Sequence, residues 1–297
     1  MQILYLTPKT DSPQDRLCHD TAELLKHHFN GNDNGNNYGL CIMHNPLNNS
    51  PAPDVVHLFG KPDVAATRYL NRAHRLHVPI IVSPLGITNK PSRHILHIAT
   101  CIHACSPTEA KAIATNGNDN DNGNDNNPSS FIPHLSSSII TIPNPLLTHS
   151  ITAEQTASRF AQLYADTIAD NDERVTRQMV ANITKAVEEA QLSIPSEARP
   201  PVAFPLTSDI ALWVLKSQLL IARRKLPHTF LLQFADTLNH QPYNEDQLIA
   251  LLRAMKLRAL MGRLLQVMAE TAQLTEGFMP MPPIDDRITE KIRKTIV

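Results

Sequence analysis

A long stretch without glycine divides this sequence. The chain contains only 9 glycines, and none lies between Gly123 and Gly262. Because glycine carries no Cβ, it is the residue that lets backbone amides approach a diphosphate closely. We therefore expect no diphosphate-binding turn between Gly123 and Gly262. Any fold assigned to the chain must be compatible with this absence.

Residues 1–150 alternate strand and helix patterns. Helical periodicity covers residues 14–29, 63–77 and 92–99. Short apolar segments predict strands at residues 3–6, 40–43, 55–59, 80–83, 101–105 and 139–142. Short apolar strands that alternate with helices favour a parallel sheet covered on both faces. We therefore expect a Rossmann-like α/β domain.

After Thr148 only helical patterns remain. Residues 152–168 begin with Thr152 and Gln155 at the spacing of a capping box, and residues 173–192 form a second amphipathic helix. The proline-rich residues 193–205 predict a linker, and further helices are expected near residues 208–226, 229–239, 246–273 and 286–296. The segment 246–273 is apolar nearly all round, which predicts the buried centre of a small bundle.

Composition and charge narrow the class of protein. Lys and Arg number 27 and Asp and Glu 28, so no net field attracts nucleic acid, and we expect no nucleic-acid partner. A basic stripe beside an apolar face in the helical region would support a peripheral membrane contact at most. No leader or membrane-spanning run is visible and the cysteines number only 4, so we expect a cytoplasmic protein.

Four short motifs follow predicted strands, at the positions where open α/β sheets place ligands. They read Asp54-Val-Val-His57-Leu-Phe-Gly60, then Ser83-Pro-Leu-Gly86, then Ser106-Pro-Thr-Glu109, then Ile142-Pro-Asn144-Pro. In order and spacing they resemble the N-terminal half of GT-B-fold glycosyltransferases of the retaining, family-four kind. The resemblance covers residues 1–147.

The resemblance implies a carbohydrate-binding cleft at the carboxyl ends of the strands. The resemblance places His57 and Gly60 at the rim of the cleft, Ser106 and Glu109 at the start of a cleft-side helix, and Asn144 at the crossing to a second domain. Lys61 and Gly86 are further candidates for the cleft. It also implies a carbohydrate acceptor and a role in cell-envelope polysaccharide synthesis. Residues 152–168, with Phe160 and Tyr164, resemble the helix that in this family returns to the N-terminal domain.

The sequence departs from the family where that family carries out catalysis. Residues 7–15, TPKTDSPQD, stand in place of paired glycines in the first loop, and Leu85 replaces the cleft histidine. A leucine can neither polarise a hydroxyl nor accept a proton. The stretch without glycine leaves no place for the nucleotide-sugar domain. The family's two glutamates eight positions apart are matched only formally, by Glu189 and Glu197.

Two clusters invite a metal site, and neither supports one well. His94, His97, Cys101, His103 and Cys105 lie close in sequence. Because a strand spreads alternate side chains about 6.6 Å apart, we expect buried side chains there rather than a zinc site. The Asn/Asp-rich insert at residues 115–127 lacks the converging carboxylates that calcium needs, so we expect a solvated loop there. The insert at residues 31–37 is also too polar to bury apolar area, and we expect no metal or other cofactor.

The sequence therefore predicts three regions: a Rossmann-like domain with its return helix at residues 1–170, a helix and linker at 171–205, and a helical bundle at 206–297. The predicted function is that of a glycosyltransferase-like protein without a donor domain and without catalysis of its own, whose helical region contacts a protein partner. Two alternatives stay open. One is an active glycosyltransferase completed by a partner chain, and the other is a protein-binding scaffold with only a Rossmann-like resemblance.

Overall fold

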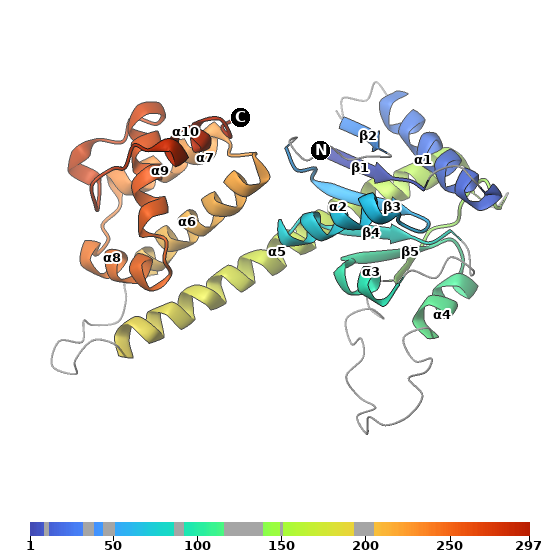
Figure 1. The fold of residues 1–297 in the computed structure, drawn as a ribbon, viewed down its shortest axis with the longest axis horizontal. Helices are drawn as coiled ribbons and strands as arrows, with labels where there is room; N and C mark the ends of the chain where they lie inside the picture. The colour runs from blue at the N-terminus through green and yellow to red at the C-terminus, as the bar shows by residue number, and fades with distance from the viewer. Residues whose placement is uncertain are drawn as a thin grey trace. The chain divides into compact units, whose positions relative to one another are not determined.

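The computed structural model of the protein describes residues 1–8, 12–31, 39–43, 51–85, 92–115, 139–148, 151–192 and 205–297 (Figure 1). The chain divides into two compact units, an α/β unit (residues 1–49 and 53–173) and a helical unit (residues 50–52 and 174–297). The division falls inside helix α5 (Ala153–Leu192), so this helix contributes residues to both units. Within the described residues, every helix is too short or too polar to cross a membrane.

The α/β unit is built on a sheet of six strands, in which all neighbours run parallel. The strands are β1 (Gln2–Leu6), β2 (Gly39–Met43), β3 (Val55–Phe59), β4 (Ile80–Ser83), β5 (Cys101–Ala104) and β6 (Ile139–Thr141). Their order is β2-β1-β3-β4-β5-β6, so the direction of strand addition reverses between β1 and β3. The predicted Rossmann-like α/β fold, followed by a helical region, is confirmed.

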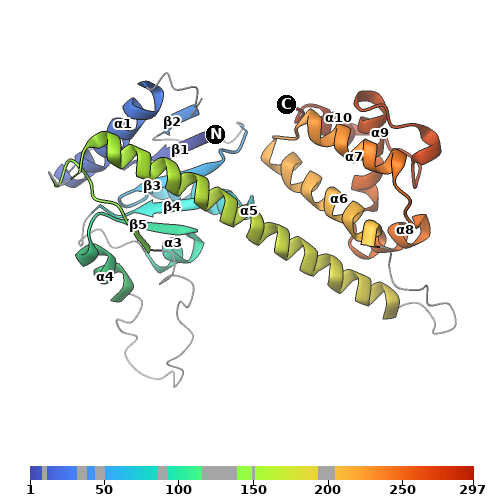
Figure 2. The same ribbon diagram turned by 180° about the vertical axis from the view of Figure 1, so that it is seen from behind.

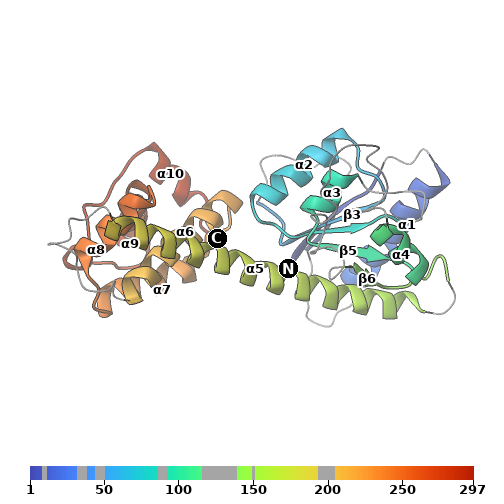
Figure 3. The ribbon, with the colours of Figure 1, turned by 90° about the horizontal axis from the view of Figure 1, so that it is seen from below.

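Helices cover both faces of this sheet (Figures 2 and 3). Helix α1 (Pro13–Gly31) and residues 153–173 of α5 pack on one face, in a core cluster that also contains Tyr5 and Phe59. Helices α2 (Val64–Arg75), α3 (Arg93–Ile98) and α4 (Pro107–Thr115) lie on the other. All residues of β3, β4 and β5 are buried, which explains why these strands read as continuous apolar runs.

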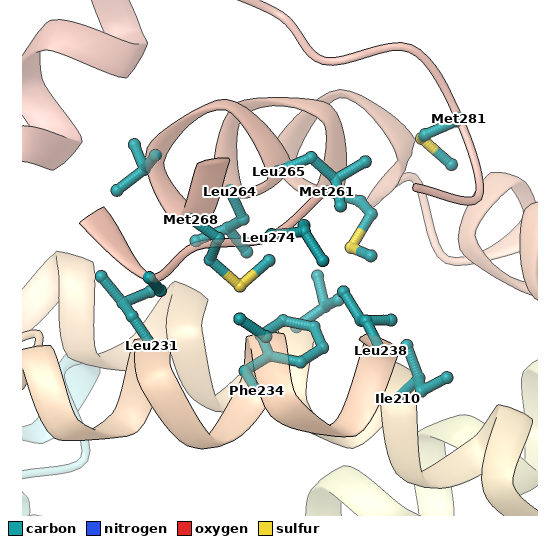
Figure 4. Packing of buried hydrophobic residues seen from close by; sticks show 14 of the residues in the cluster. Ile210, Leu231, Phe234, Leu238, Met261, Leu264, Leu265, Met268, Leu274 and Met281 are labelled. Atoms are coloured by element: carbon teal, nitrogen blue, oxygen red, sulfur yellow. The ribbon is translucent and has the colours of Figure 1, made fainter. Parts of the chain in front are cut away.

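The helical unit packs its helices around an apolar core that includes Phe234 and Met268 (Figure 4). Its elements are α6 (Pro205–Arg223), α7 (His228–His240), α8 (Glu245–Ala254), α9 (Arg258–Thr271), the 3-10 helix η2 (Glu276–Phe278) and α10 (Arg287–Arg293). Gly262, the first glycine after the long gap, allows a close backbone approach. The Ile284 amide donates to its carbonyl at 2.9 Å, and a Cβ at Gly262 would lie 2.8 Å from the Ile284 side chain.

The predicted break between helices 152–168 and 173–192 is wrong, because α5 is continuous from Ala153 to Leu192. Asn and Asp residues at 170–172 resemble helix caps in the sequence. In the structure the side chain of Asn171 instead donates to the backbone carbonyl of His77 at 2.8 Å. A tertiary contact has taken the group that would otherwise cap a helix.

The predicted single helix 246–273 is also wrong, because α8 ends at Ala254 and α9 starts at Arg258. Lys256 takes the left-handed conformation with φ 58°, and the Leu257 amide donates to the Leu252 carbonyl at 2.7 Å. This is a Schellman termination, in which glycine usually occupies the left-handed position. The same left-handed conformation ends α2 at His77, with φ 52°, and α6 at Arg224, with φ 56°. A chain poor in glycine therefore ends several helices without the sequence signal that marks such ends.

Candidate functional site

Gly60 and Lys61 lie where the sequence placed them relative to the sheet, directly after β3 and beside the reversal in strand order. Gly60 has φ 71°, and its amide donates to the Ser83 carbonyl at 2.7 Å. A Cβ at this position would lie 2.8 Å from Sγ of Cys18, so the turn requires glycine. Lys61 is exposed at this edge. Gly86 lies outside the described residues.

Ser106 and Glu109 form the start of α4, as the resemblance implied. The Glu109 amide donates to Oγ of Ser106 at 3.1 Å, and Oε2 of Glu109 accepts from the Cys105 amide at 2.6 Å. Only 3% of Glu109 is exposed. Its carboxylate therefore serves the backbone at the end of β5 and the start of α4.

Asn144 anchors the segment between β6 and α5. Its side-chain amide donates to Oγ1 of Thr21 on α1 at 2.9 Å, and its Oδ1 accepts from the Leu146 amide at 2.9 Å. The capping box predicted at the start of α5 is confirmed, because Thr152 and Gln155 exchange side-chain to backbone hydrogen bonds at 3.1 and 3.2 Å. Asn144 is thus a buried anchor of the crossing from sheet to helix.

The expectation that His57 lies at the rim is wrong. Its side chain is fully buried on the face of β3 that α5 covers, and Phe160 of α5 lies over it with ring centroids 5.4 Å apart. Both ring nitrogens are occupied, Nδ1 by the Tyr164 hydroxyl at 2.7 Å and Nε2 by the Ser83 hydroxyl at 2.6 Å. In this arrangement the ring has no nitrogen to offer to a ligand at the edge of the sheet.

His57 belongs to a buried row of hydrogen-bonded side chains that crosses the sheet beneath α5. We call it the polar row, and its members are Tyr5, Tyr164, His57, Ser83 and His103. Beyond the His57 contacts, Oγ of Ser83 lies 2.6 Å from Nδ1 of His103, and the two tyrosine hydroxyls are 3.1 Å apart. The row ends where Nε2 of His103 meets the Ile142 carbonyl at 2.7 Å. It thus links strands β1, β3, β4 and β5 to helix α5.

Hydrogen-bond chemistry fixes the direction of this row. A carbonyl only accepts, so Nε2 of His103 carries a proton and Nδ1 of the same neutral ring accepts from Ser83. The Ser83 oxygen then accepts from Nε2 of His57, whose Nδ1 accepts from Tyr164. Tyr164 has a single proton, which the shorter contact of 2.7 Å to His57 uses in this order, and its hydroxyl lies 3.1 Å from that of Tyr5. From Tyr164 to Ile142, each donor is oriented toward Ile142.

Burial keeps the members of the row uncharged. It lowers the pKa of His103 to about 4, although the Ile142 carbonyl opposes this. Burial, and then the nearby His103, lower the pKa of His57 well below its usual 6.5. Burial, and then Tyr5, raise the pKa of Tyr164 well above its usual 10.0. These directions agree with the neutral imidazoles that the hydrogen bonds require.

Several helices that start at the carboxyl edge carry an acidic residue at their N-terminus. Oδ2 of Asp15 accepts from the Ser12 amide at 3.2 Å at the start of α1, and Oδ1 of Asp63 accepts from the Ala66 amide at 2.7 Å at the start of α2. Glu109 plays the same part at α4. Helix N-termini usually attract phosphate through free amides and a positive dipole end. Here carboxylates oppose a bound phosphate at these helix starts.

A shallow groove of about 490 Å³ lies beside the anchored crossing segment. Its lining residues are Pro143, Ile151, Gln155, Ser158 and Arg159. Pro143 lies two residues after the end of β6, and Gln155, Ser158 and Arg159 belong to the first turns of α5. The groove therefore opens at the same edge as Gly60 and Asn144. It brings one cation and two hydrogen-bonding side chains to an open surface.

Sequence reasoning did not identify the polar row, although it had marked some of its members. His103 was assigned to a buried strand, and its 1% exposure confirms this. The signal that could have revealed the row is the placing of Tyr5, His57, Ser83 and His103 on one face of four adjacent strands. Among the described residues, His, Cys, Asp and Glu side chains form no group of three that could hold a metal ion.

Comparisons of the chain with protein-family models, with curated proteins and with solved structures gave no match.

Proposed function

We propose that the α/β unit is a glycosyltransferase-like domain that binds carbohydrate at the carboxyl edge of its sheet and does not transfer sugars by itself. The four strand-end motifs, the reversal in strand order beside Gly60 and the packing of residues 153–173 on the sheet support this proposal. The proposal that the domain does not catalyse transfer rests on the burial and hydrogen bonding of His57. A histidine buried with both nitrogens bonded supplies no general base to a substrate.

The capped helix starts support the absence of a donor site. A nucleotide-sugar carries a diphosphate, and Asp15, Asp63 and Glu109 place negative charge where that group would be held. The exposed Lys61 and the groove beside Arg159 remain as polar surface for sugar hydroxyls or acidic sugars.

The test separates binding from turnover. The purified full chain is titrated with a panel of nucleotide-sugars and, separately, with neutral and acidic oligosaccharides. We expect no nucleotide-sugar binding or nucleotide release, and oligosaccharide binding that Lys61→Ala or Arg159→Ala weakens. Lys185→Ala is the matched control, because Lys185 is an exposed lysine on the part of α5 that belongs to the helical unit. Release of nucleotide by the pure protein contradicts the non-catalytic proposal, and failure to bind any oligosaccharide contradicts the carbohydrate site.

A second candidate function, a protein-binding scaffold, is favoured by large apolar side chains exposed on the helical unit. Leu232, Phe278 and Ile288 are 41%, 49% and 46% exposed. Such side chains are common at protein interfaces when they gather in one patch. Replacing Phe278 with Asp should abolish capture of a partner while leaving the fluorescence of Trp213, the only tryptophan, unchanged. Equal capture by wild type and variant would remove this residue from the interface.

A further inference from the structure

We propose that the polar row is an acid-sensitive latch, which holds residues 153–173 of α5 on the sheet while both imidazoles are neutral and releases them when both take up protons. The inference does not depend on the carbohydrate site. It rests on the direction of the hydrogen bonds, on burial and on the way α5 is attached.

A single added proton can be accommodated without breaking the row. If it enters at Nδ1 of His103, this nitrogen donates to Ser83 and Ser83 donates to Nε2 of His57. The His57 ring stays neutral, its proton moves from Nε2 to Nδ1, and Nδ1 donates to Tyr164. The bonds between Ser83 and Tyr164 thus reverse direction, and Tyr164 then donates to Tyr5. The distances are compatible with both orders, and the unfavourable term is the burial of one charge.

A second proton cannot be accommodated. Oγ of Ser83 lies 2.6 Å from a nitrogen of each imidazole, so with both rings charged it faces two donors and its own proton loses its acceptor. The two cations would then lie on either side of one hydroxyl, in a site that is buried from solvent. Two like charges this close together in a buried site are strongly unfavourable.

Among the residues that the structure describes, no carboxylate is hydrogen-bonded to either imidazole ring or shifts the pKa of either histidine. The described titratable side chains in the cluster that surrounds the rings are Tyr5 on β1, Cys101 and Cys105 on β5, Tyr164 on α5 and Cys18 on α1. All are neutral in mild acid. Glu109, at the end of β5, is bonded to the Cys105 amide. Access to water is therefore what would stabilise the two imidazolium groups.

Helix α5 is the element whose departure gives that access. Phe160 covers both rings, with its centroid 5.4 Å from His57 and 4.7 Å from His103. The strands are held by backbone ladders, whereas the hydrogen bonds from α5 to the sheet side come from side chains, among them Tyr164 and Asn171. Lifting the helix breaks fewer backbone bonds than separating the strands.

Thiol labelling provides the test, because Cys101 and Cys105 flank His103 on the covered face. The full chain is labelled between pH 7 and pH 5 with a pyridyl disulfide, and the labelled sites are mapped by mass spectrometry. Rates are divided by those of an unfolded reference at the same pH. Because release is linked to the uptake of two protons, we expect the labelling rate of both cysteines to rise by at least about tenfold from pH 7 to pH 5. Backbone amides of β3 and β4 should stay protected from hydrogen exchange over the same range.

The matched control is Asn171→Ala, which removes another attachment of α5 that contains no titratable side chain. It should raise labelling by a similar factor at every pH. His103→Asn should flatten the pH dependence. Because that variant could fail to fold, nitrogen NMR of the wild-type histidines gives an independent readout. We expect it to show both rings neutral and protonated at Nε2 while α5 is packed on the sheet. The proposal is overturned by pH-independent labelling, by an imidazolium signal from both rings in the closed protein, or by simultaneous loss of amide protection in the strands.

Discussion

The buried polar groups of the two units are organised differently. In the helical unit, Ser217 and Thr289 are fully buried, and each hydroxyl donates to a nearby backbone carbonyl in its own part of the chain. In the α/β unit, Ser83 is equally buried, but it joins two histidines on neighbouring strands. The first arrangement involves groups close in sequence. The second requires strands β1, β3, β4 and β5 to pair in the correct register and α5 to pack on them.

This difference indicates how each core responds to change. A core of interdigitated apolar side chains loses stability in proportion to the volume removed from it. A buried polar network loses stability when one partner disappears, because the remaining groups stay buried without hydrogen bonds. The helical unit should therefore be sensitive to side-chain size, and the α/β unit to hydrogen-bond complementarity and pH.

The largest effect is expected from Phe234→Ala in the helical unit. Phe234 is fully buried, and its ring stacks on Trp213 with centroids 5.5 Å apart. Loss of the ring should lower the free energy of unfolding by about 3–5 kcal/mol. Urea unfolding followed by Trp213 fluorescence measures this. Thiol labelling of Cys101 and Cys105 under native conditions should stay unchanged, and a parallel rise would show that the two cores are not independent.

Ser83→Ala should come next. It leaves Nε2–H of His57 and Nδ1 of His103 buried without their partner, at a cost of about 2–4 kcal/mol. Ser217→Ala is the matched change in the helical unit and should cost less than about 1 kcal/mol, because only the carbonyl of Trp213 loses a second hydrogen bond. Each is measured by the urea midpoint of its own unit. Equal losses for the two serines would contradict the contrast between the cores.

Acidification from pH 6.5 to 5.5 should act mainly on the α/β unit. Buried His57 and His103 have pKa values below 6.5, so the unfolded chain binds more protons than the folded one as the pH falls below 6.5. The contribution of the two neutral histidines to the free energy of unfolding is fully present above pH 6.5. It decreases toward pH 4, by up to about 1.4 kcal/mol per pH unit for each histidine.

In the helical unit, the Arg293 guanidinium lowers the pKa of Glu270, and Arg263 lowers the pKa of Asp286. These carboxylates take up protons in the unfolded chain only near pH 4 and below, so the helical unit should begin to lose stability later. Thermal unfolding is measured between pH 7 and pH 4, with Trp213 fluorescence for the helical unit and thiol labelling for the α/β unit. The two signals compare the pH ranges over which the two units lose stability. Loss of both signals at the same pH would contradict the prediction.

The smallest effect is expected from Lys256→Gly, which should stabilise the helical unit by about 1 kcal/mol. Lys256 ends α8 with φ 58°, a conformation that is unfavourable for residues with a Cβ. In the α/β unit, His77 likewise ends α2 with φ 52°, whereas the turn after β3 has a glycine, Gly60, with φ 71°. Lys185→Gly, at an exposed position inside α5, should instead destabilise by about 1 kcal/mol. The urea midpoint by Trp213 fluorescence measures both, and a loss of stability in Lys256→Gly would show that its side chain contributes more than its backbone conformation costs.

Much of the fold followed from local patterns. All six strands and the helix starting near residue 14 lie where short apolar runs and helical periodicity predicted them. Capping chemistry also fixed the starts of α4 and α5, because Ser106 with Glu109, and Thr152 with Gln155, satisfy backbone amides only a few residues away. Such signals are readable because the interacting groups are close in sequence.

The predictions that failed depended on groups far apart in the chain. Asn171 does not end a helix because the His77 carbonyl accepts its amide across 94 residues, and a lysine ends α8 where the pattern offered no glycine. His57 was assigned to the rim because strand ends in such sheets meet at a ligand site. Whether its ring faced that edge or the underside of α5 depended on the position of Tyr164, 107 residues away.

By itself, the sequence determined the alternation of strands and helices, the absence of glycine between Gly123 and Gly262 and the polar residues available at the strand ends. Each follows from residue type, side-chain periodicity and backbone preference. Tertiary structure alone decided that Tyr5, Tyr164, His57, Ser83 and His103 meet in one buried row. A hydrogen bond forms over about 3 Å, and only the parallel register of the strands together with the return of α5 brings these five side chains that close.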